Sequence, residues 1–191
     1  MSDVLLTPGE QTMLLRIART TVEKAVGVDR GGSQNAGDEA GSNLRSKRGV
    51  FVTVHSIEGS HRKLRGCIGR MIGDKPLKDL TAEMAVSAAL HDPRFPPLRT
   101  EELSEIHFEI SVLGPLTPVT DIDEIRIGID GLLLRAGGRS GVFLPQVPVE
   151  QEWSVPVYLE QLCKKAGVAP GAWREPQSEL LKFSAQVFAE P

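Results

Sequence analysis

The spacing of hydrophobic and polar positions predicts a helix near the start of the chain, followed by a polar segment. Between Leu14 and Val26, apolar side chains recur at the spacing of one helix face. The preceding Thr7-Pro8-Gly9-Glu10 combines a threonine N-cap, a proline at the first helical position and a capping-box glutamate. We therefore expect a helix of about five turns within residues 1–27. Residues 28–48, rich in Gly, Ser, Asn and Asp as far as position 43, favour a flexible surface loop.

The next segment, residues 49–114, has the pattern of a hairpin, a helix and a strand. Two extended runs, 50–57 and 63–68, are separated by a short Glu-Gly-Ser turn. A helix with Pro76 in its first turn and one apolar face comes next, and residues 106–112 then alternate strictly between apolar and polar side chains. This alternation predicts a strand with one buried face.

Residues 127–190 repeat the same order of elements. Extended runs at 131–135 and 141–144 flank a Gly-Gly turn, a helix follows with one apolar face, and a strand is expected at 181–188. Two such repeats predict an α+β fold with mixed or antiparallel sheets and flanking helices.

The length of 191 residues indicates one domain over residues 1–191, or two small lobes that share a core, and the composition excludes several other classes of protein. Hydrophobic residues make up 40% and charged residues 25%, and no apolar stretch approaches the roughly 18 residues of a membrane-spanning helix. Cys67 and Cys163 are too few for a disulfide framework or a four-thiolate zinc site. The first residues lack the basic and apolar regions of a signal peptide, so a cytoplasmic protein is expected.

Positive charge is concentrated between residues 45 and 70. This window holds seven Lys and Arg side chains against one acid, Glu58, whereas the whole chain has a net charge of −3. A local positive field on an acidic protein indicates a small anionic ligand. Nucleic acid is the less favoured ligand, because Phe51 is the only aromatic residue in the window and single-strand sites need stacking platforms. A solvated basic hairpin is the alternative.

The strongest candidate for chemistry is Cys67, within residues 64–69. If Leu64 and Ile68 face the core, strand alternation turns Arg65 and Cys67 together to the other face. A thiol with basic neighbours is more readily ionised, as a nucleophilic cysteine requires. The alternative is that Cys67 is a small buried hydrophobic residue.

The two glycines of this segment suggest a binding role. Gly66 and Gly69 carry no side chain, so a ligand could approach the backbone closely there. The basic neighbours expected to favour the thiolate of Cys67 include Lys63 and Arg70 beside Arg65.

A second candidate segment, residues 91–98, follows the predicted helix and contains three prolines that restrict it. His91 or Asp92 could act as a general base, and Arg94 could bind a carboxylate or phosphate. Alternatively, His91 caps the helix and Arg94 pairs with a surface acid.

Three further candidates come from later in the chain. Glu109 could share a surface with Cys67 if their strands belong to one sheet, although polar sheet faces more often simply contact solvent. Gln146 and Glu150, in an expected loop, suit contacts to a ligand amide or stabilisation of a turn.

No metal or cofactor site is expected. The four histidines lack paired ligand spacing, and Cys163 falls on an apolar helix face. The sequence also contains no P-loop, dinucleotide fingerprint or serine nucleophile elbow.

Several segments resemble the AMMECR domain family, the protein-A component of the Amme-Memo-Radical-SAM set. The similarity extends from the N-terminal helix almost to the last residue, and its signature is Leu64-Arg65-Gly66-Cys67-Ile68-Gly69. The other matching segments are 49–53, 92–98, 109–113, 144–147 with Glu150 and Trp153, and 162–167 with Trp173. The polar segment 27–43 departs from the pattern, because relatives usually carry a shorter or different connection there.

The resemblance implies an α+β fold with two repeats and a cleft between a larger and a smaller lobe. It implies no settled reaction, although the signature motifs of the family collect near that cleft. A Memo-type protein and a radical-SAM enzyme are the implied partners. Any iron–sulfur cluster would belong to the latter, because this chain lacks the clustered cysteines to bind one.

Two main hypotheses of function follow, together with nucleic-acid binding as a third and weaker one. The first is an enzyme or ligand-processing protein acting on a small anionic molecule, in which Cys67 is the nucleophile. In it Arg65 and Arg94 neutralise the ligand and Glu109 or His91 moves protons. The remaining positions expected to line the site are Gly66, Gly69, Asp92, Gln146 and Glu150. The second hypothesis is a non-catalytic module that scaffolds, or presents substrate to, a radical enzyme.

Overall fold

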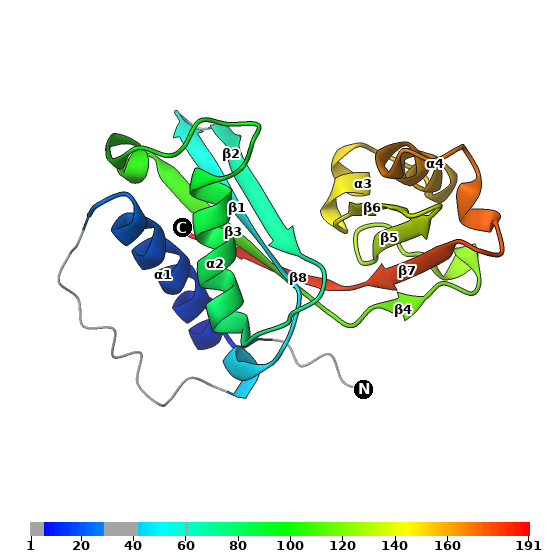
Figure 1. The fold of residues 1–191 in the computed structure, drawn as a ribbon, viewed down its shortest axis with the longest axis horizontal. Coiled ribbons are helices and arrows are strands. Elements are labelled where there is room, and N and C mark those ends of the chain that lie inside the picture. The colour runs from blue at the N-terminus through cyan, green and yellow to red at the C-terminus, as the bar shows by residue number, and fades with distance from the viewer. Residues whose placement is uncertain (1–5, 29–41, 60) are drawn as a thin grey trace. The chain divides into compact units, whose positions relative to one another are not determined.

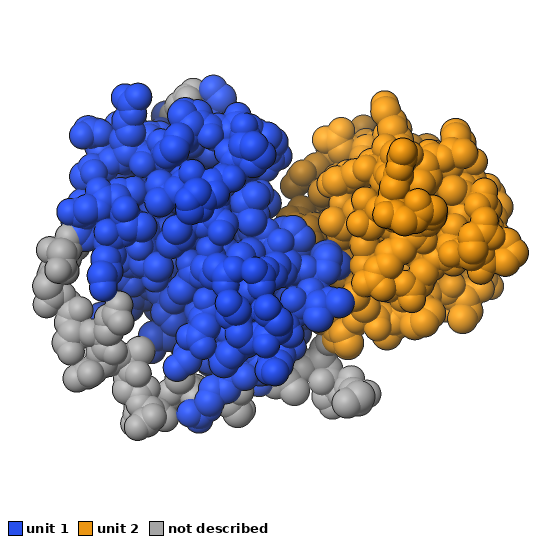
Figure 2. Space-filling model, viewed as in Figure 1, with its two compact units in different colours: residues 1–113, 186–191 blue, residues 114–185 orange. Residues whose placement is uncertain are grey.

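The computed structural model describes residues 6–28, 42–59 and 61–191. Most of the loop expected at 28–48 lies outside these residues, as does Ser60 of the first hairpin turn. The described part divides into two compact units, coloured separately in Figure 2. Unit 1 comprises residues up to Leu113 together with Gln186–Pro191, and unit 2 comprises Gly114–Ala185.

Unit 1 contains two helices and four strands. They are α1 (Pro8–Ala25), β1 (Val50–Glu58), β2 (His61–Arg70), α2 (Leu77–Leu90), β3 (Ile106–Leu113) and β8 (Ala185–Ala189), with 3-10 turns at Ser42–Arg45 and Thr100–Ser104. The strands form one sheet in the order β2-β1-β3-β8. Helices α1 and α2 pack side by side and cover one face of this sheet (Figure 1).

The capping sequence expected before α1 forms as predicted. The Glu10 backbone N–H donates to Thr7 Oγ1 at 3.3 Å, and the Thr7 N–H donates to Glu10 Oε2 at 2.9 Å. Two of the N–H groups at the helix start are thereby satisfied, and Pro8 has none to satisfy.

The core of unit 1 lies between the helices and the sheet. The alternating valines of β1, at positions 50, 52 and 54, and the apolar residues 106, 108, 110 and 112 of β3 face the helices and are fully or almost fully buried. Leu77, Leu80 and Met84 of α2 pack against them. The face predicted for β3 is therefore confirmed, and the opposite face of the sheet carries the remaining side chains.

Unit 2 is built around a second four-stranded sheet with the order β4-β7-β5-β6. Its elements are β4 (Thr117–Pro118), β5 (Gly131–Ala136), β6 (Arg139–Phe143), α3 (Gln146–Glu150), α4 (Val155–Ala166) and β7 (Glu179–Phe183), with 3-10 turns at Ile122–Glu124 and Ala172–Arg174. Helix α4 packs on β5 and β6. Gly137 and Gly138 both have positive φ, as the predicted two-residue hairpin turn requires.

Two predictions about elements were wrong. The single strand expected at 181–188 is two strands, because the chain leaves the unit 2 sheet after Phe183 and joins the unit 1 sheet as β8. The last residues of the second repeat, expected over 127–190, therefore belong to unit 1. The loop expected around Gln146 is the short helix α3. The fold class is nevertheless α+β as predicted, and within the described residues no helix is long and apolar enough to cross a membrane.

Candidate functional site

A β-bulge in β2 decides which side chains accompany Cys67. In the pairing of β1 with β2, Cys67 lies opposite Thr53, and the register then shifts so that Leu64 lies opposite His55. Arg65 is the additional residue of the bulge. Leu64 therefore shares a face with Cys67 and is 39% exposed, so the prediction that it faces the core was wrong.

Arg65 is bound away from Cys67. Its Nε and Nη2 donate to the two carboxylate oxygens of Glu102 at 2.8 and 3.1 Å, and its Nη1 donates to the carbonyl of Pro96 at 2.9 Å. Because this bidentate pair satisfies a side chain that is only 12% exposed, the expectation that Arg65 neutralises a ligand is corrected. Arg65 and Glu102 form an ion pair within the protein.

Two of the seven basic residues of the positive window are paired with acids that lie further along the chain. Besides the Arg65 pair, Arg70 bonds Asp74 at 2.9 Å and Glu83 at 2.6 Å. A count of charges within a sequence window does not include such distant partners. Arg65 and Arg70 therefore do not add to the excess charge that indicated an anionic ligand.

The sheet face turned away from α1 and α2 carries a cluster of polar side chains, which we call the polar face. Its members are Thr53 and His55 of β1, Cys67 of β2, and His107, Glu109 and Ser111 of β3. Cys67, Thr53 and Glu109 occupy one row across three strands, since Thr53 is in register with both of the others. The alternation of β3 thus places Glu109 on the same face as Cys67, in the arrangement that the sequence suggested.

Contacts along this face are few. Thr53 Oγ1 donates a hydrogen bond to Cys67 Sγ at 3.3 Å. In the next row His55 lies opposite His107, and His55 Nε2 is 4.0 Å from Glu109 Oε2, which is too long for a hydrogen bond.

Several polar atoms of the polar face are buried without a hydrogen-bond partner. They include both ring nitrogens of His55, Nδ1 of His107 and Oγ of Ser111, which is only 1% exposed. Buried polar groups in folded proteins are nearly always satisfied. Their concentration on one sheet face makes this face the candidate site of unit 1.

Asp92 and Arg94 fix the backbone of Cys67 from outside the sheet. Because β2 is an edge strand, the N–H and carbonyl of Cys67 on its outer side need other partners. The N–H donates to Asp92 Oδ2 at 2.9 Å, and Arg94 Nη2 donates to the carbonyl at 3.3 Å. Arg94 also pairs with Asp92 through Nη2 at 2.7 Å and Nε at 3.0 Å. The Arg94 hydrogen bonds hold the pKa of Asp92 far below its usual range.

The surroundings of Cys67 shift the pKa of its thiol upward. Burial raises its pKa, and the carboxylates of Asp92 and Glu109 raise it further, against the lowering effects of the Thr53 hydrogen bond and of Arg94. The prediction that basic neighbours would favour the thiolate was therefore wrong, since two carboxylates lie nearby and the Arg65 and Arg70 charges are paired elsewhere.

The two glycines of the signature serve close packing. A Cβ at Gly66 would lie 2.1 Å from the backbone oxygen of Ala88 in α2, and one at Gly69 would lie 2.3 Å from the ring of Phe51. The space above each glycine is thus filled by the protein itself, which corrects the expectation that they expose backbone to a ligand.

The remaining candidates are His91 of unit 1, which is not part of the polar face, and two residues of unit 2. His91 is exposed at the C-cap of α2, where its backbone N–H donates to the Ser87 carbonyl. Gln146 and Glu150 lie on α3 of unit 2, with the amide oxygen of Gln146 buried and unpaired and Glu150 exposed. Sequence reasoning missed Thr53 and His55, although both occupy the polar phase of the alternating run 50–57.

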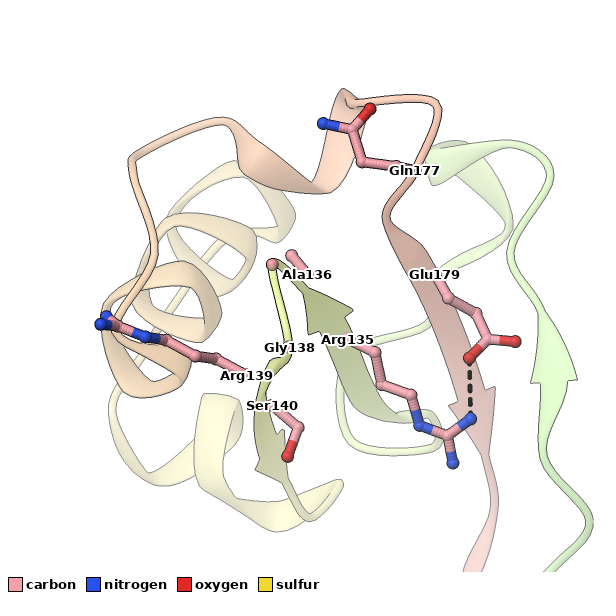
Figure 3. Close-up of a pocket in the computed structure, with 8 residues that line it drawn as sticks. Arg135, Ala136, Gly138, Arg139, Ser140, Gln177 and Glu179 are labelled. Atoms are coloured by element: carbon pink, nitrogen blue, oxygen red, sulfur yellow. Dashed lines mark hydrogen bonds and ion pairs between the residues drawn. The ribbon is translucent and has the colours of Figure 1, made fainter.

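Unit 2 has an open hollow of about 430 Å³ at the tip of the β5–β6 hairpin (Figure 3). Its charged groups are already engaged: Arg135 pairs with Glu179 at 2.7 Å, and Arg139 donates to the carbonyl of Gly167. The hollow is otherwise lined by small or amide side chains and glycine backbone. We therefore place the candidate site on the polar face of unit 1.

No group of three His, Cys, Asp or Glu side chains that could bind a metal ion occurs within the described ranges. The polar face contains a thiol, a carboxylate and two imidazoles, but they are not gathered as a ligand set. Its chemistry is that of nucleophiles and proton carriers.

Comparison with known proteins gives consistent similarities over nearly the whole chain. Residues 15–188 match the family model described as AMMECR1. A protein of Thermococcus gammatolerans is 40% identical over 93% of this chain and 88% of its own length, and protein MK0488 of Methanopyrus kandleri is 42% identical over 97% and 90%. The crystal structure of the uncharacterized protein PH0010 from Pyrococcus horikoshii is similar with a TM-score of 0.85 and 34% identity, covering 97% of this chain and 93% of that one. None of these names states an activity.

Proposed function

The chain belongs to the AMMECR1 family, and from that premise we propose that it is an enzyme that processes a small molecule on the polar face of unit 1, with Cys67 as the nucleophile. One observation carries this proposal. The row Cys67–Thr53–Glu109 is held in register by the sheet and is bordered by buried polar atoms for which the described part of the chain offers no hydrogen-bond partner.

The resting thiol needs a proton acceptor, and His55 is suited to that role. Its two ring nitrogens are unpaired, and Glu109 lies 4.0 Å from its Nε2, where a carboxylate stabilises an imidazolium. The proton of the Cys67 thiol passes to a ring nitrogen of His55. The sulfur then forms a bond to an electrophilic carbon of the substrate, and the π electrons of that carbon move to its heteroatom.

Thr53 and the Asp92–Arg94 pair position the sulfur for this step. The Thr53 hydroxyl donates to Sγ and stabilises the thiolate as it forms. Asp92 and Arg94 bind the backbone on either side of the Cys67 side chain and restrict its movement. They are positioning residues, because they act through Cys67.

Alkylation of the folded protein by chloroacetamide, followed by peptide mass analysis, tests this proposal. We expect Cys67 to react while Cys163, buried on α4, does not. His55→Gln is expected to slow the reaction at Cys67 by roughly tenfold because the proton acceptor is lost. His61→Gln, at an exposed position of β2, is the matched control and should leave the rate unchanged. A Cys67 that reacts only after unfolding would overturn the proposal.

The partial burial of the Cys67 thiol, which raises its pKa, also favours a second candidate function, a non-catalytic module. In that case unit 1 would bind the partners that the family resemblance implies, a Memo-type protein and a radical-SAM enzyme, and Cys67 would be a packing residue. Cys67→Ser separates the two functions, because it abolishes processing by Cys67 but leaves partner binding intact.

A further inference from the structure

Glu109 sets the charge of the polar face. Among the described residues of this face it is the only carboxylate, and the pair Asp92–Arg94 beside Cys67 is internally neutralised. Arg65 is bound to Glu102 and Arg70 to Asp74 and Glu83.

The nearest cation in register on this face is remote from the row. Arg62 lies opposite Ile57, four residues along β1 from Thr53, which corresponds to about 13 Å of extended strand. Beyond β3, positions 185, 187 and 189 of β8 are apolar. A ligand over Thr53 therefore meets the carboxylate of Glu109 with His55 beside it, and no lysine or arginine in register nearby among the described residues of this face.

The unpaired groups also indicate how the ligand must present itself. A carboxylate offers only acceptors, a neutral imidazole offers one acceptor and one donor, and a hydroxyl offers both. The four side chains Glu109, His55, His107 and Ser111 together offer a ligand more hydrogen-bond acceptors than donors. The complementary ligand is rich in N–H donors.

We propose that the ligand of the polar face carries a planar cationic nitrogen group, an amidinium or guanidinium, which lies over Thr53 and donates to the carboxylate of Glu109. Such a group matches a carboxylate through paired N–H donors, as arginine does. This inference rests on the proposed function, since it names the substrate class of the same site. It replaces the anionic ligand that the sequence suggested.

Binding of this group would also promote the reaction of the thiol. The Glu109 carboxylate is one of the charges that disfavour the thiolate of Cys67. A cation against Glu109 cancels that effect, so the nucleophile forms when the ligand is present. The other groups that affect the pKa of the thiol are Thr53, Asp92 and Arg94, and the thiol proton passes to His55 as in the proposed function.

Two isosteric reagents test the charge preference directly. Chloroacetamidine is cationic and chloroacetamide is neutral, and with either the sulfur displaces chloride from the same carbon. The second-order rate constants at Cys67 are measured at pH 8 and divided by those of free glutathione. We expect the corrected ratio of amidine to amide to be at least about tenfold in the unaltered protein.

Variants of Glu109 provide the control. Glu109→Gln should bring the corrected ratio close to one, Glu109→Asp should retain part of the preference, and Glu101→Gln, at an exposed position in the 3-10 turn Thr100–Ser104, should leave it unchanged. Thermal unfolding of each variant verifies that it is folded.

The outcomes separate the two proposals. Reaction of Cys67 with both reagents but without preference, or faster reaction with chloroacetate than with chloroacetamide, would overturn the cationic ligand and leave the nucleophile in place. A Cys67 inert to all three reagents would remove the nucleophile and the inferred ligand together.

Discussion

Thr53 lies between Cys67 and Glu109 in the proposed site. It is 8% exposed, donates to Cys67 Sγ, and lies in register with Glu109 on its other side. A hydroxyl in this position stabilises negative charge on the sulfur. Because the threonine side chain is short, it also leaves space for a ligand between the thiol and the carboxylate.

Replacement of Thr53 by valine removes the hydroxyl and retains the shape. Loss of a hydrogen bond worth about 1 kcal/mol raises the pKa of the Cys67 thiol further, so alkylation at pH 8 should slow by roughly fivefold. Thr53→Ser keeps the donor and should react at a rate close to that of the unaltered protein. Equal rates for the valine and serine variants would show that the Sγ contact does not stabilise the thiolate.

Asp92 contributes stability that depends on pH. Its folded-state pKa is depressed below the unfolded value of about 3.9, so the contribution is complete above that pH and is lost as the pH falls through the folded-state value. We expect Asp92→Asn to lower the free energy of unfolding by about 2 kcal/mol at pH 7, because the buried side chain bonds Cys67 and Arg94. The difference from the unaltered protein should shrink below pH 4.

Urea unfolding at pH 7, 5 and 3 measures this dependence. Asp74→Asn removes a carboxylate from an exposed pair with Arg70 and serves as the control, with an expected change under about 0.5 kcal/mol. A deficit for Asp92→Asn that persisted undiminished at pH 3 would contradict the assignment.

Strand alternation indicated that Cys67 and Glu109 could share a face if their strands belonged to one sheet, and the strand order β2-β1-β3 fulfils that condition. The alternation failed for Arg65 because one extra residue in a strand reverses the direction of every side chain on one side of the bulge. The partner of Arg65, Glu102, is 37 residues away in sequence. No local pattern indicates such a pairing. For this reason the sequence predicted that basic neighbours favour the thiolate of Cys67, whereas the folded surroundings raise the pKa of its thiol.

At the scale of elements, Gly66 determines how closely α2 approaches β2. The backbone oxygen of Ala88 occupies the position of the missing side chain. The end of α2 is followed directly by the Asp92–Arg94 segment that binds Cys67. The spacing between helix and strand therefore also sets the geometry of the site.

Gly66→Ala would force α2 away from β2. Because the new Cβ would meet backbone and not a movable side chain, we expect the free energy of unfolding to fall by roughly 1–3 kcal/mol or more. Gly9→Ala, in α1 with nothing near the added methyl group, is the control and should be neutral or stabilising by about 0.5 kcal/mol. Chemical denaturation of both variants checks this, and an equally stable Gly66→Ala would contradict the packing argument.

Elements with local signals were predicted well, and those decided at long range were not. The capping box before α1 and the Gly-Gly turn after β5 act through neighbouring residues. The break between β7 and β8 has no such signal, since Phe183-Ser184-Ala185 reads as continuous strand. The position of this break depends on the two sheets: residues 179–183 pair within the sheet of unit 2, and residues 185–189 pair with the edge of the unit 1 sheet at β3.

At the scale of the whole molecule, unit 2 is an insertion in the sheet of unit 1. The chain leaves unit 1 after β3 and returns as β8, the strand next to β3. A hydrogen bond from the Gly114 N–H to the Ser184 carbonyl holds the two ends of the insertion together. Glu190, after β8, then pairs with Arg19 of α1 at 2.7 Å and accepts from the Phe108 N–H.

Unit 1 should therefore fold when residues 114–185 are replaced by a short glycine-rich linker, since the joined strands are neighbours. We expect this protein to unfold cooperatively in a thermal scan followed by circular dichroism. A chain ending at Leu113 should be markedly less stable, because it loses β8 and leaves Arg19 without Glu190. Equal stability of the two chains would show that β8 is dispensable.

The return of the chain as β8 also affects the order in which the protein can be completed during its synthesis. The sheet carrying Cys67, Thr53 and Glu109 lacks its fourth strand until residues 185–189 have been translated, although its other three strands are made early. Unit 2 has all of its strands before then. Unit 1 is thus begun before unit 2 but completed after it, and until β8 is made the edge of β3 has no partner strand in this sheet.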